Sequence, residues 1–140
     1  KHHPEAIERI HSSPEIFLER ENPKSLARFT HILIMGHDWS IDQNLLTGIL
    51  SMMDDEEWTT TVGTIGSKAK WNSFSIAAKQ IGIKTSILNQ ILCPIGVDIS
   101  AESPEEIAVA VCAQIIDERA RILRGEDKIK HTGWRSTQTD

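Results

Sequence analysis

The sequence is poor in cysteine, lacks a long apolar run and carries no excess of positive charge. Its 140 residues include two cysteines, which are too few for a disulfide framework. The longest apolar runs fall far short of the roughly 18 residues that a membrane-spanning helix needs. A net charge of -5 without a basic stripe argues against a nucleic-acid partner. Because no charged-then-apolar leader opens the chain, we expect a cytoplasmic protein that contacts neither membrane nor nucleic acid.

Several catalytic and ligand-binding signatures are also missing. The absence of a Gly-x-Ser-x-Gly elbow argues against a Ser-His-Asp hydrolase. No Cys/His set has zinc spacing, and His2, His3 and His11 are too loosely spaced for a metal site, so we expect no bound metal. Cys112 falls in an apolar helical pattern and is interpreted as a small core residue. For Cys93 a structural role is favoured over a reactive thiol.

What the sequence does contain is an alternation of strand and helix patterns. Residues 30–36, THILIMG, form an apolar run without polar alternation, which fits a parallel strand covered on both faces. Residues 58–65 predict a second strand, residues 97–99 a short third one, and residues 7–10 a possible further one. Helical patterns separate these strands. The order predicts an α/β sandwich built on a parallel sheet with right-handed crossovers.

Serine residues mark the predicted helix starts. Ser13 and Ser103 each precede a proline, which suits the first helical position, and predict helices over residues 14–21 and 104–124. Ser40 predicts the N-cap of another helix that carries an apolar stripe. Between residues 107 and 116 only a glutamine is polar, so we expect the final helix to be deeply buried.

Candidate ligand-binding groups follow the predicted strands, because ligands of open parallel sheets bind at the carboxyl ends of the strands. Gly36, His37 and Asp38 follow the first strand. A histidine beside a carboxylate can act as an acid/base pair or contact a polar ligand. The structural alternative is that Asp38 only satisfies loop amides while His37 is solvated.

Gly66, Ser67 and Lys68 follow the second strand and open a helix. Glycine permits close approach of backbone to a ligand, and free amides at a helix start attract an anion such as phosphate. A plain glycine turn with a serine cap explains the same residues.

A third group lies in a proline-glycine turn that contains Pro94, Gly96 and Asp98. An aspartate among apolar residues is costly unless it is paired or hydrogen-bonded. Asp98 therefore either holds its own loop together or contacts a ligand.

Three segments have a distinctive order and spacing: GHD after a strand (residues 36–38), TVGTIGSKAKWNSF (residues 61–74) and CPIGVDISAESPEEIAVAVCAQII (residues 93–116). Together they resemble the C-terminal domain of the XdhC/CoxI family, accessory proteins for xanthine dehydrogenase and related molybdenum hydroxylases. The resemblance covers about residues 30–120 well and residues 5–29 loosely.

The resemblance implies a Rossmann-like parallel sheet with helices on both faces and a chaperone role for molybdenum cofactor (molybdopterin). In that role the protein would bind the cofactor, protect it during sulfuration and pass it to the apo molybdenum hydroxylase. It also implies docking with a cysteine desulfurase and a homodimer. By position, His37 and Asp38 are candidate catalytic residues. The residues implied for cofactor binding are Gly36, His37, Asp38, Gly66, Ser67, Lys68, Pro94, Gly96 and Asp98.

The chain departs from the family pattern in several places. It lacks the first glycine-rich β-α unit, Gly36 stands where threonine is common, and Ser100 stands where glycine is common. We therefore expect a Rossmann-like domain over residues 1–125 that is incomplete at its N-terminus, followed by a tail over residues 126–140. A second chain can supply the missing half.

Three functions stay open from the sequence. The favoured one is a non-catalytic chaperone that binds molybdenum cofactor or a related pterin or nucleotide phosphate. The second is an NAD(P)-dependent oxidoreductase, or a subunit of one, with His37 as acid/base. The missing glycine-rich turn weakens it, because hydride transfer needs a firmly held cofactor. The third is a protein-interaction module without a ligand.

Overall fold

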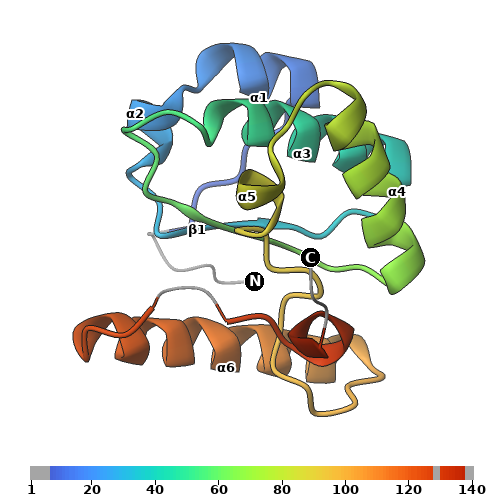
Figure 1. Cartoon of the computed structure of the whole chain (residues 1–140), viewed down its shortest axis with the longest axis vertical. Coiled ribbons are helices and arrows are strands. Elements are labelled where there is room, and N and C mark those ends of the chain that lie inside the picture. The colour runs from blue at the N-terminus through green and yellow to red at the C-terminus, as the bar shows by residue number, and fades with distance from the viewer. Residues whose placement is uncertain (1–6, 128–129, 138–140) are drawn as a thin grey trace.

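The computed structural model describes residues 7–127 and 130–137, in which a small parallel sheet lies between two helical layers (Figure 1). Strands β1 (His31–Ile34) and β2 (Thr61–Thr64) pair in parallel, with His31 opposite Thr61 and Ile34 opposite Thr64. These strands lie inside the two longest strands that the sequence predicts. One helical layer contains α1 (Pro14–Arg20), α2 (Pro23–Leu26), α3 (Trp39–Met52), α4 (Lys68–Gln80) and α5 (Thr85–Leu88), and the other is α6 (Pro104–Leu123).

The third strand is not where the sequence placed it. The next contact with β2 is made by Leu92, which forms an isolated parallel bridge with Gly63. Residues 97–99 are irregular, and the predicted strand there is wrong. The Val97 N–H donates to the carbonyl oxygen of Ala110 at 3.1 Å, so this segment is bonded to α6 instead of to the sheet. Residues 7–10 are also irregular and exposed, which makes that predicted strand wrong as well.

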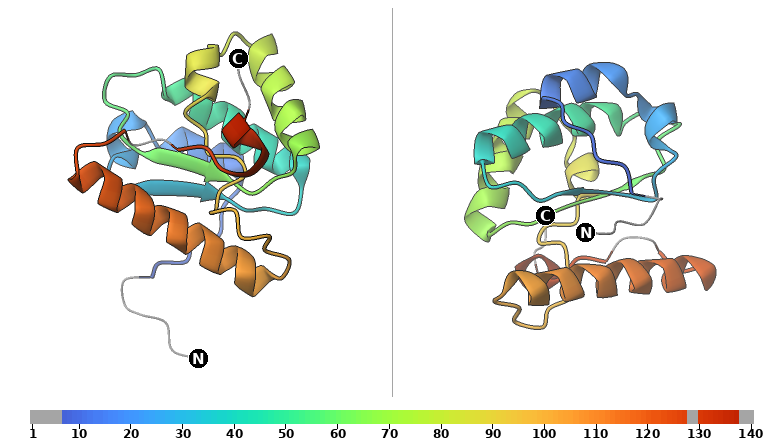
Figure 2. Two further views of the ribbon diagram at one scale, coloured as in Figure 1. Left: turned by 60° about the horizontal axis from the view of Figure 1, so that its bottom comes forward. Right: turned by 180° about the vertical axis from the view of Figure 1, so that it is seen from behind.

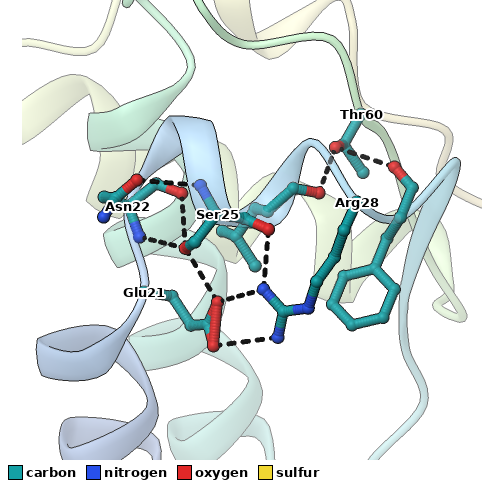
Figure 3. Close-up of polar contacts among 7 residues, drawn as sticks. Glu21, Asn22, Ser25, Arg28 and Thr60 are labelled. Atoms are coloured by element: carbon teal, nitrogen blue, oxygen red, sulfur yellow. Dashed lines mark hydrogen bonds and ion pairs between the residues drawn. The ribbon is translucent and has the colours of Figure 1, made fainter.

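Helix α1 begins after its predicted cap, Ser13, and the chain then forms an unpredicted second helix (Figure 3). The side chain of Asn22 accepts from the Ser25 N–H, and the Ser25 hydroxyl accepts from the Asn22 N–H, both at 2.8 Å. This reciprocal capping starts α2 where the sequence predicted only an end. The buried Thr60 hydroxyl is 2.8 Å from the Leu26 carbonyl oxygen and 3.0 Å from that of Phe29, which ties α2 to the start of β2.

Helix α3 begins two residues before the predicted position. The Asp38 carboxylate accepts from the backbone N–H groups of Ser40 and Ile41, at 2.8 and 3.3 Å, so Asp38 rather than Ser40 is the N-cap. Both residue types cap helices well, and the earlier one is used here.

The hydrophobic core has two parts, one on each face of the sheet. Side chains of Ile34 and Val62 point to the layer of α3, α4 and α5, whereas Leu33 and Ile65 face α6. This alternation follows from the two-residue period of a strand. The larger part consists of Ile34, Leu46, Ile49, Leu50, Met53, Val62, Trp71, Phe74, Ala78, Ile87, Leu88, Ile91 and Cys93.

Helix α6 starts and stops as predicted but is not deeply buried. The Ser103 hydroxyl accepts from the Glu106 N–H at 3.1 Å, and Gly125 ends the helix with φ +76°. Only one side of the helix packs on the sheet, because α6 is the outermost layer (Figure 1). Val109 and Ile116 are 62% and 59% exposed. Cys112 is exposed too, so its prediction as a core residue is wrong.

The end of the described chain packs back on the domain. Residues 133–137 form a short 3-10 helix in which Trp134 contacts the larger core. The Arg135 guanidinium stacks 4.3 Å from the Trp71 ring centroid and donates to the carbonyl oxygens of Ile91 and Cys93. Trp134 therefore packs within its own chain. His2 and His3 lie outside the described residues.

Candidate functional site

The predicted site residues Gly66 and Ser67, after β2, and Pro94, Gly96 and Asp98, in the proline-glycine turn, line one cavity of about 340 Å³. We call this cavity the Ser67 pocket. Its polar and turn residues include Gly66, Ser67, Pro94, Gly96, Asp98, Ser100, Thr132 and Gly133, and its apolar floor includes Ile65, Ile95, Ile107 and Ala110. These segments meet because β2 and the segment after Leu92 run side by side and turn at the same edge of the sheet.

One wall of the Ser67 pocket is the start of α4. The Ser67 hydroxyl accepts from the Lys70 N–H at 3.2 Å, which makes Ser67 the N-cap of this 13-residue helix. The first turn of α4 contains no acidic residue and includes Lys68. The first amides of a helix lack intrahelical partners and carry the positive end of its dipole. This wall therefore favours a negatively charged group.

The opposite wall is a turn held by α6 and the C-terminal segment. Gly96 has φ +119°, a conformation that favours glycine. Its N–H donates to the side-chain oxygen of Gln114, and its carbonyl oxygen accepts from the Thr132 hydroxyl at 2.7 Å. An added Cβ at Gly96 would lie 3.2 Å from the Cβ of Ala110. The turn is thus fixed from both sides without the help of Asp98.

Asp98 is exposed at the mouth of the Ser67 pocket. Within residues 7–127 and 130–137, its carboxylate has neither a hydrogen-bond partner nor an ion-pair partner. Asp98 therefore has no part in holding its own loop together, and its contact with a ligand stays a prediction.

The residues after β1 lie apart from this pocket. Gly36 lines a second cavity, of about 610 Å³, which runs along β1 and the start of α3. Asp38 is occupied as an N-cap, and its pKa is lowered by the hydrogen bonds from the Ser40 hydroxyl and from the Ile41 and Ser40 amides. His37 and Lys68 are exposed and line neither cavity. For Asp38 the structural alternative therefore accounts for the contacts, and a catalytic role of His37 and Asp38 stays a prediction.

A buried ion pair that sequence reasoning missed lies beneath the two glycine turns. Lys70 Nζ on α4 is 2.9 Å from Asp42 Oδ2 on α3, and 7% and 2% of the two side chains are exposed. An added Cβ at Gly36 would collide with Asp42, and one at Gly66 would lie 3.1 Å from Lys70 Cδ. The pair therefore joins the helices that start at the carboxyl ends of β1 and β2.

Cys93, like Lys70, is buried beneath the Gly66 turn, where an added Cβ at Gly66 would lie 3.4 Å from the Cys93 Sγ. Burial raises the pKa of the Cys93 thiol to about 12, against the opposing effect of the Arg135 and Lys70 charges. A thiol that stays protonated is a poor nucleophile. This environment favours the structural interpretation of Cys93.

The described part of the chain has neither a cluster of metal ligands nor a membrane-spanning helix. Among residues 7–127 and 130–137, no three side chains of His, Cys, Asp or Glu are grouped so that they can hold a metal ion. None of the helices in these ranges has the length and apolar character that crossing a membrane requires.

Comparison with known proteins matches residues 2–115 to the family model described as the XdhC Rossmann domain. No curated protein matches the sequence. The family model covers most of the 140 residues and includes the start of α4 and the Gly96 turn, whereas Thr132 and Gly133 of the Ser67 pocket lie beyond it. The chain therefore belongs to the XdhC family through its Rossmann domain, and this membership implies an accessory role in the maturation of xanthine dehydrogenase.

Proposed function

We propose that the chain binds molybdenum cofactor in the Ser67 pocket and delivers it to an apo molybdenum hydroxylase without chemical turnover. The observation that carries this proposal is the convergence of two separate turns on one cavity, one with free helix amides and the other with an unpartnered carboxylate. Molybdenum cofactor is a pterin dithiolene that ends in a phosphate, so it offers a matching group to each wall.

The phosphate fits the start of α4 better than the start of α6. The first turn of α4 has no acidic residue, whereas the first turn of α6 contains Glu105 and Glu106. The Ser67 hydroxyl and the amides of residues 67 and 68 would hold the phosphate, as helix N-termini do in other phosphate-binding proteins. The nearby Lys68 adds positive charge.

The pterin fits the rest of the pocket. Its ring N–H and amino groups are donors, and the Asp98 carboxylate is an acceptor without a described partner. Ile65, Ile95 and Ile107 provide apolar surface for the flat ring. The volume of about 340 Å³ lies at the lower end of the range for small-molecule pockets, which suits a partly exposed cargo that is later released.

A carrier agrees with these surroundings better than a redox enzyme does. The cofactor supplies the metal chemistry that the client hydroxylase uses, and this chain only has to bind and orient it. The side chains with a hydroxyl or carboxyl group that line the pocket are Ser67, Asp98, Ser100 and Thr132. His37 does not line the pocket. This arrangement supports binding without proton transfer to a substrate.

The substitution Ser67→Asp tests the phosphate site. Aspartate is also a good N-cap, so α4 keeps its start, but the new carboxylate occupies the place proposed for the phosphate. Two like charges about 4 Å apart repel by roughly 1 kcal/mol in bulk water and roughly 4 kcal/mol near a protein surface, so we expect binding to be at least about fivefold weaker. The measurement is a fluorescence titration with molybdenum cofactor freshly released from a purified molybdoenzyme.

Ser13→Asp is the matched control, because Ser13 caps α1 in the same way and lies outside the Ser67 pocket. It should leave the affinity unchanged. Equal affinity of Ser67→Asp and the wild-type protein would exclude this pocket as the phosphate site. A valine at Gly66 is a poorer test, since its Cβ would face Lys70 and Cys93 in the interior.

A further inference from the structure

We propose that residues 130–135 form a strap that orders the Asp98 wall of the Ser67 pocket, so that docking of the strap and binding of the ligand strengthen each other. The strap runs back along α6 toward the first turn of that helix (Figures 1 and 2). It lies beyond residues 2–115, which the family comparison matches. The inference rests on the proposed function for the identity of the ligand, whereas the order of the wall can be measured without a ligand.

Arg135 anchors the strap to the edge of the sheet. Its Nη1 donates to the carbonyl oxygens of Ile91 and Cys93, at 3.2 and 3.3 Å. Leu92, which lies between these two residues, bonds to β2 through its own N–H and carbonyl oxygen, so the neighbouring carbonyls point away from β2. The Arg135 side chain is 5% exposed and stacks on Trp71. The anchor therefore covers a sheet edge that would otherwise present unpaired carbonyl groups.

Thr132 fixes the turn that carries Asp98. Its hydroxyl donates to the Gly96 carbonyl oxygen at 2.7 Å. On the other side of the turn, the Gly96 N–H donates to the side-chain oxygen of Gln114, and the side-chain amide of Gln114 donates to the Lys130 carbonyl oxygen at 3.2 Å. Both backbone hydrogen bonds of Gly96 thus lead to the strap, one directly and the other through Gln114. This arrangement makes Thr132 a positioning residue for the wall.

Gly133 brings the strap against the pocket. It has φ +57°, and an added Cβ would lie 3.3 Å from Cγ of Pro94. Thr132 and Gly133 also line the Ser67 pocket themselves. Departure of the strap therefore removes part of the pocket lining together with the support of the Gly96 turn.

These contacts couple the strap to the ligand. Side chains of Thr132, Gln114 and Arg135 hold the strap, so it can leave without breaking the bonds between β1 and β2. Such a local opening costs less free energy than global unfolding. A ligand that contacts Ser67 and Asp98 together needs the ordered turn, so it binds the docked form more tightly. By linkage, the ligand stabilises the docked strap by the same factor.

Amide hydrogen exchange of the full chain, followed by NMR without ligand, tests the role of Thr132. Thr132→Val keeps the shape of the side chain but removes its hydroxyl. It should speed exchange of the Gly96 amide about tenfold, because the turn loses a hydrogen bond and opens more often. The Leu92 amide, which donates to the Val62 carbonyl oxygen at 3.0 Å, should exchange as in the wild-type protein. Thr132→Ser keeps the hydroxyl and should restore slow exchange of Gly96.

Two further variants bracket this result. Gly133→Ala pushes the strap away from Pro94 and should speed exchange of the Gly96 amide by a different route. Thr85→Val, at an exposed threonine outside the Ser67 pocket, is the matched control and should leave that exchange unchanged. If the Gly96 amide exchanges in Thr132→Val and Gly133→Ala as slowly as in the wild-type protein, the strap does not order the turn and the proposal is wrong.

The coupling is measured by titration with molybdenum cofactor freshly released from a purified molybdoenzyme. Thr132→Val should bind it at least about fivefold more weakly than the wild-type protein, and Thr132→Ser should bind it equally well. Bound cofactor should also slow exchange of the Gly96 amide in the wild-type protein. Equal affinity of Thr132→Val and the wild-type protein would overturn the coupling. A wild-type chain that binds no cofactor would contradict the proposed function, while the exchange rates would still decide whether the strap orders the turn.

Discussion

The buried ion pair between Asp42 and Lys70 permits a quantitative prediction about stability. Asp42→Asn keeps the size and shape of the side chain but removes its charge, so no cavity accompanies the change. The Lys70 ammonium then remains in an interior where 7% of its side chain is exposed, with a neutral amide 2.9 Å away in place of the carboxylate. The perturbation therefore isolates the electrostatic role of Asp42.

The expected loss is large because the remaining charge is buried. Removal of one partner of a buried ion pair typically costs about 3 to 5 kcal/mol in the free energy of unfolding. The exposed pair of Lys84 and Asp54 provides the control. Its shortest N–O distance is a similar 3.2 Å, but 65% and 62% of the two side chains are exposed. Asp54→Asn should cost no more than about 1 kcal/mol.

Urea unfolding followed by tryptophan fluorescence measures both values, because Trp71 is 5% exposed in the core next to Lys70. A third variant with Asp42→Leu and Lys70→Met removes both charges. It should be clearly more stable than Asp42→Asn, since no unpaired charge stays buried. If Asp42→Asn costs no more than Asp54→Asn, the ammonium reaches water and the assigned role of the pair in joining α3 to α4 is wrong.

Three further predictions concern local features. Ser103→Ala should lower the free energy of unfolding by about 1 kcal/mol in urea denaturation, because it removes the acceptor for the Glu106 N–H, and an unchanged midpoint would contradict the cap. Ser100 has φ +54°, so Ser100→Gly should raise the melting temperature and stabilise the protein by up to about 1 kcal/mol, whereas a lower melting temperature would contradict the assigned strain. The Arg28 hydrogen bond lowers the pKa of Glu21 below its ordinary value of 4.5 (Figure 3). The stability advantage of the wild-type protein over Glu21→Gln should therefore be full above pH 4.5 and shrink as the pH falls below that value, and an advantage that grows on acidification would contradict the pair.

Sequence patterns predicted the elements best where one residue decides the backbone conformation. Ser13 and Ser103, each followed by proline, start helices as expected. Gly82 and Gly125 adopt the positive φ values that end α4 and α6. The convergence of Gly66 and Pro94 on one pocket also follows from a general property of parallel sheets, whose turns at the carboxyl ends share an edge.

The errors arise where long-range contacts choose between locally similar options. Asp38 and Ser40 are both good caps, and only the path of the chain out of β1 decides between them. Residues 97–99 have strand-like composition, but the bonds to β2 are already made by Leu92 and Ile95. No local pattern reveals that the adjacent positions on the sheet are taken.

The buried charges were missed although the sequence contains a signal for them. Asp42 is spaced by four, seven and eight residues from Leu46, Ile49 and Leu50, all of which are buried. Lys70 likewise precedes Phe74 by four residues on α4. An acid within one apolar stripe and a base within the next predict a buried pair, and this pattern needs both helices to be considered together.

The burial of α6 was overestimated for a related reason. Its apolar residues form two stripes, and the sequence alone does not tell a core helix from an outer helix with a second binding face. The structure assigns one stripe to the sheet and leaves Val109, Cys112 and Ile116 exposed.

The central claim is that the Ser67 pocket holds molybdenum cofactor, and anomalous X-ray diffraction at the molybdenum edge tests it most directly. Crystals of the protein loaded with cofactor should show the metal at the pocket, with the phosphate at the Ser67 and Lys68 amides and the pterin beside Asp98. Metal density beside Gly36 in the cavity along β1, or no ordered metal in loaded crystals, would contradict the account.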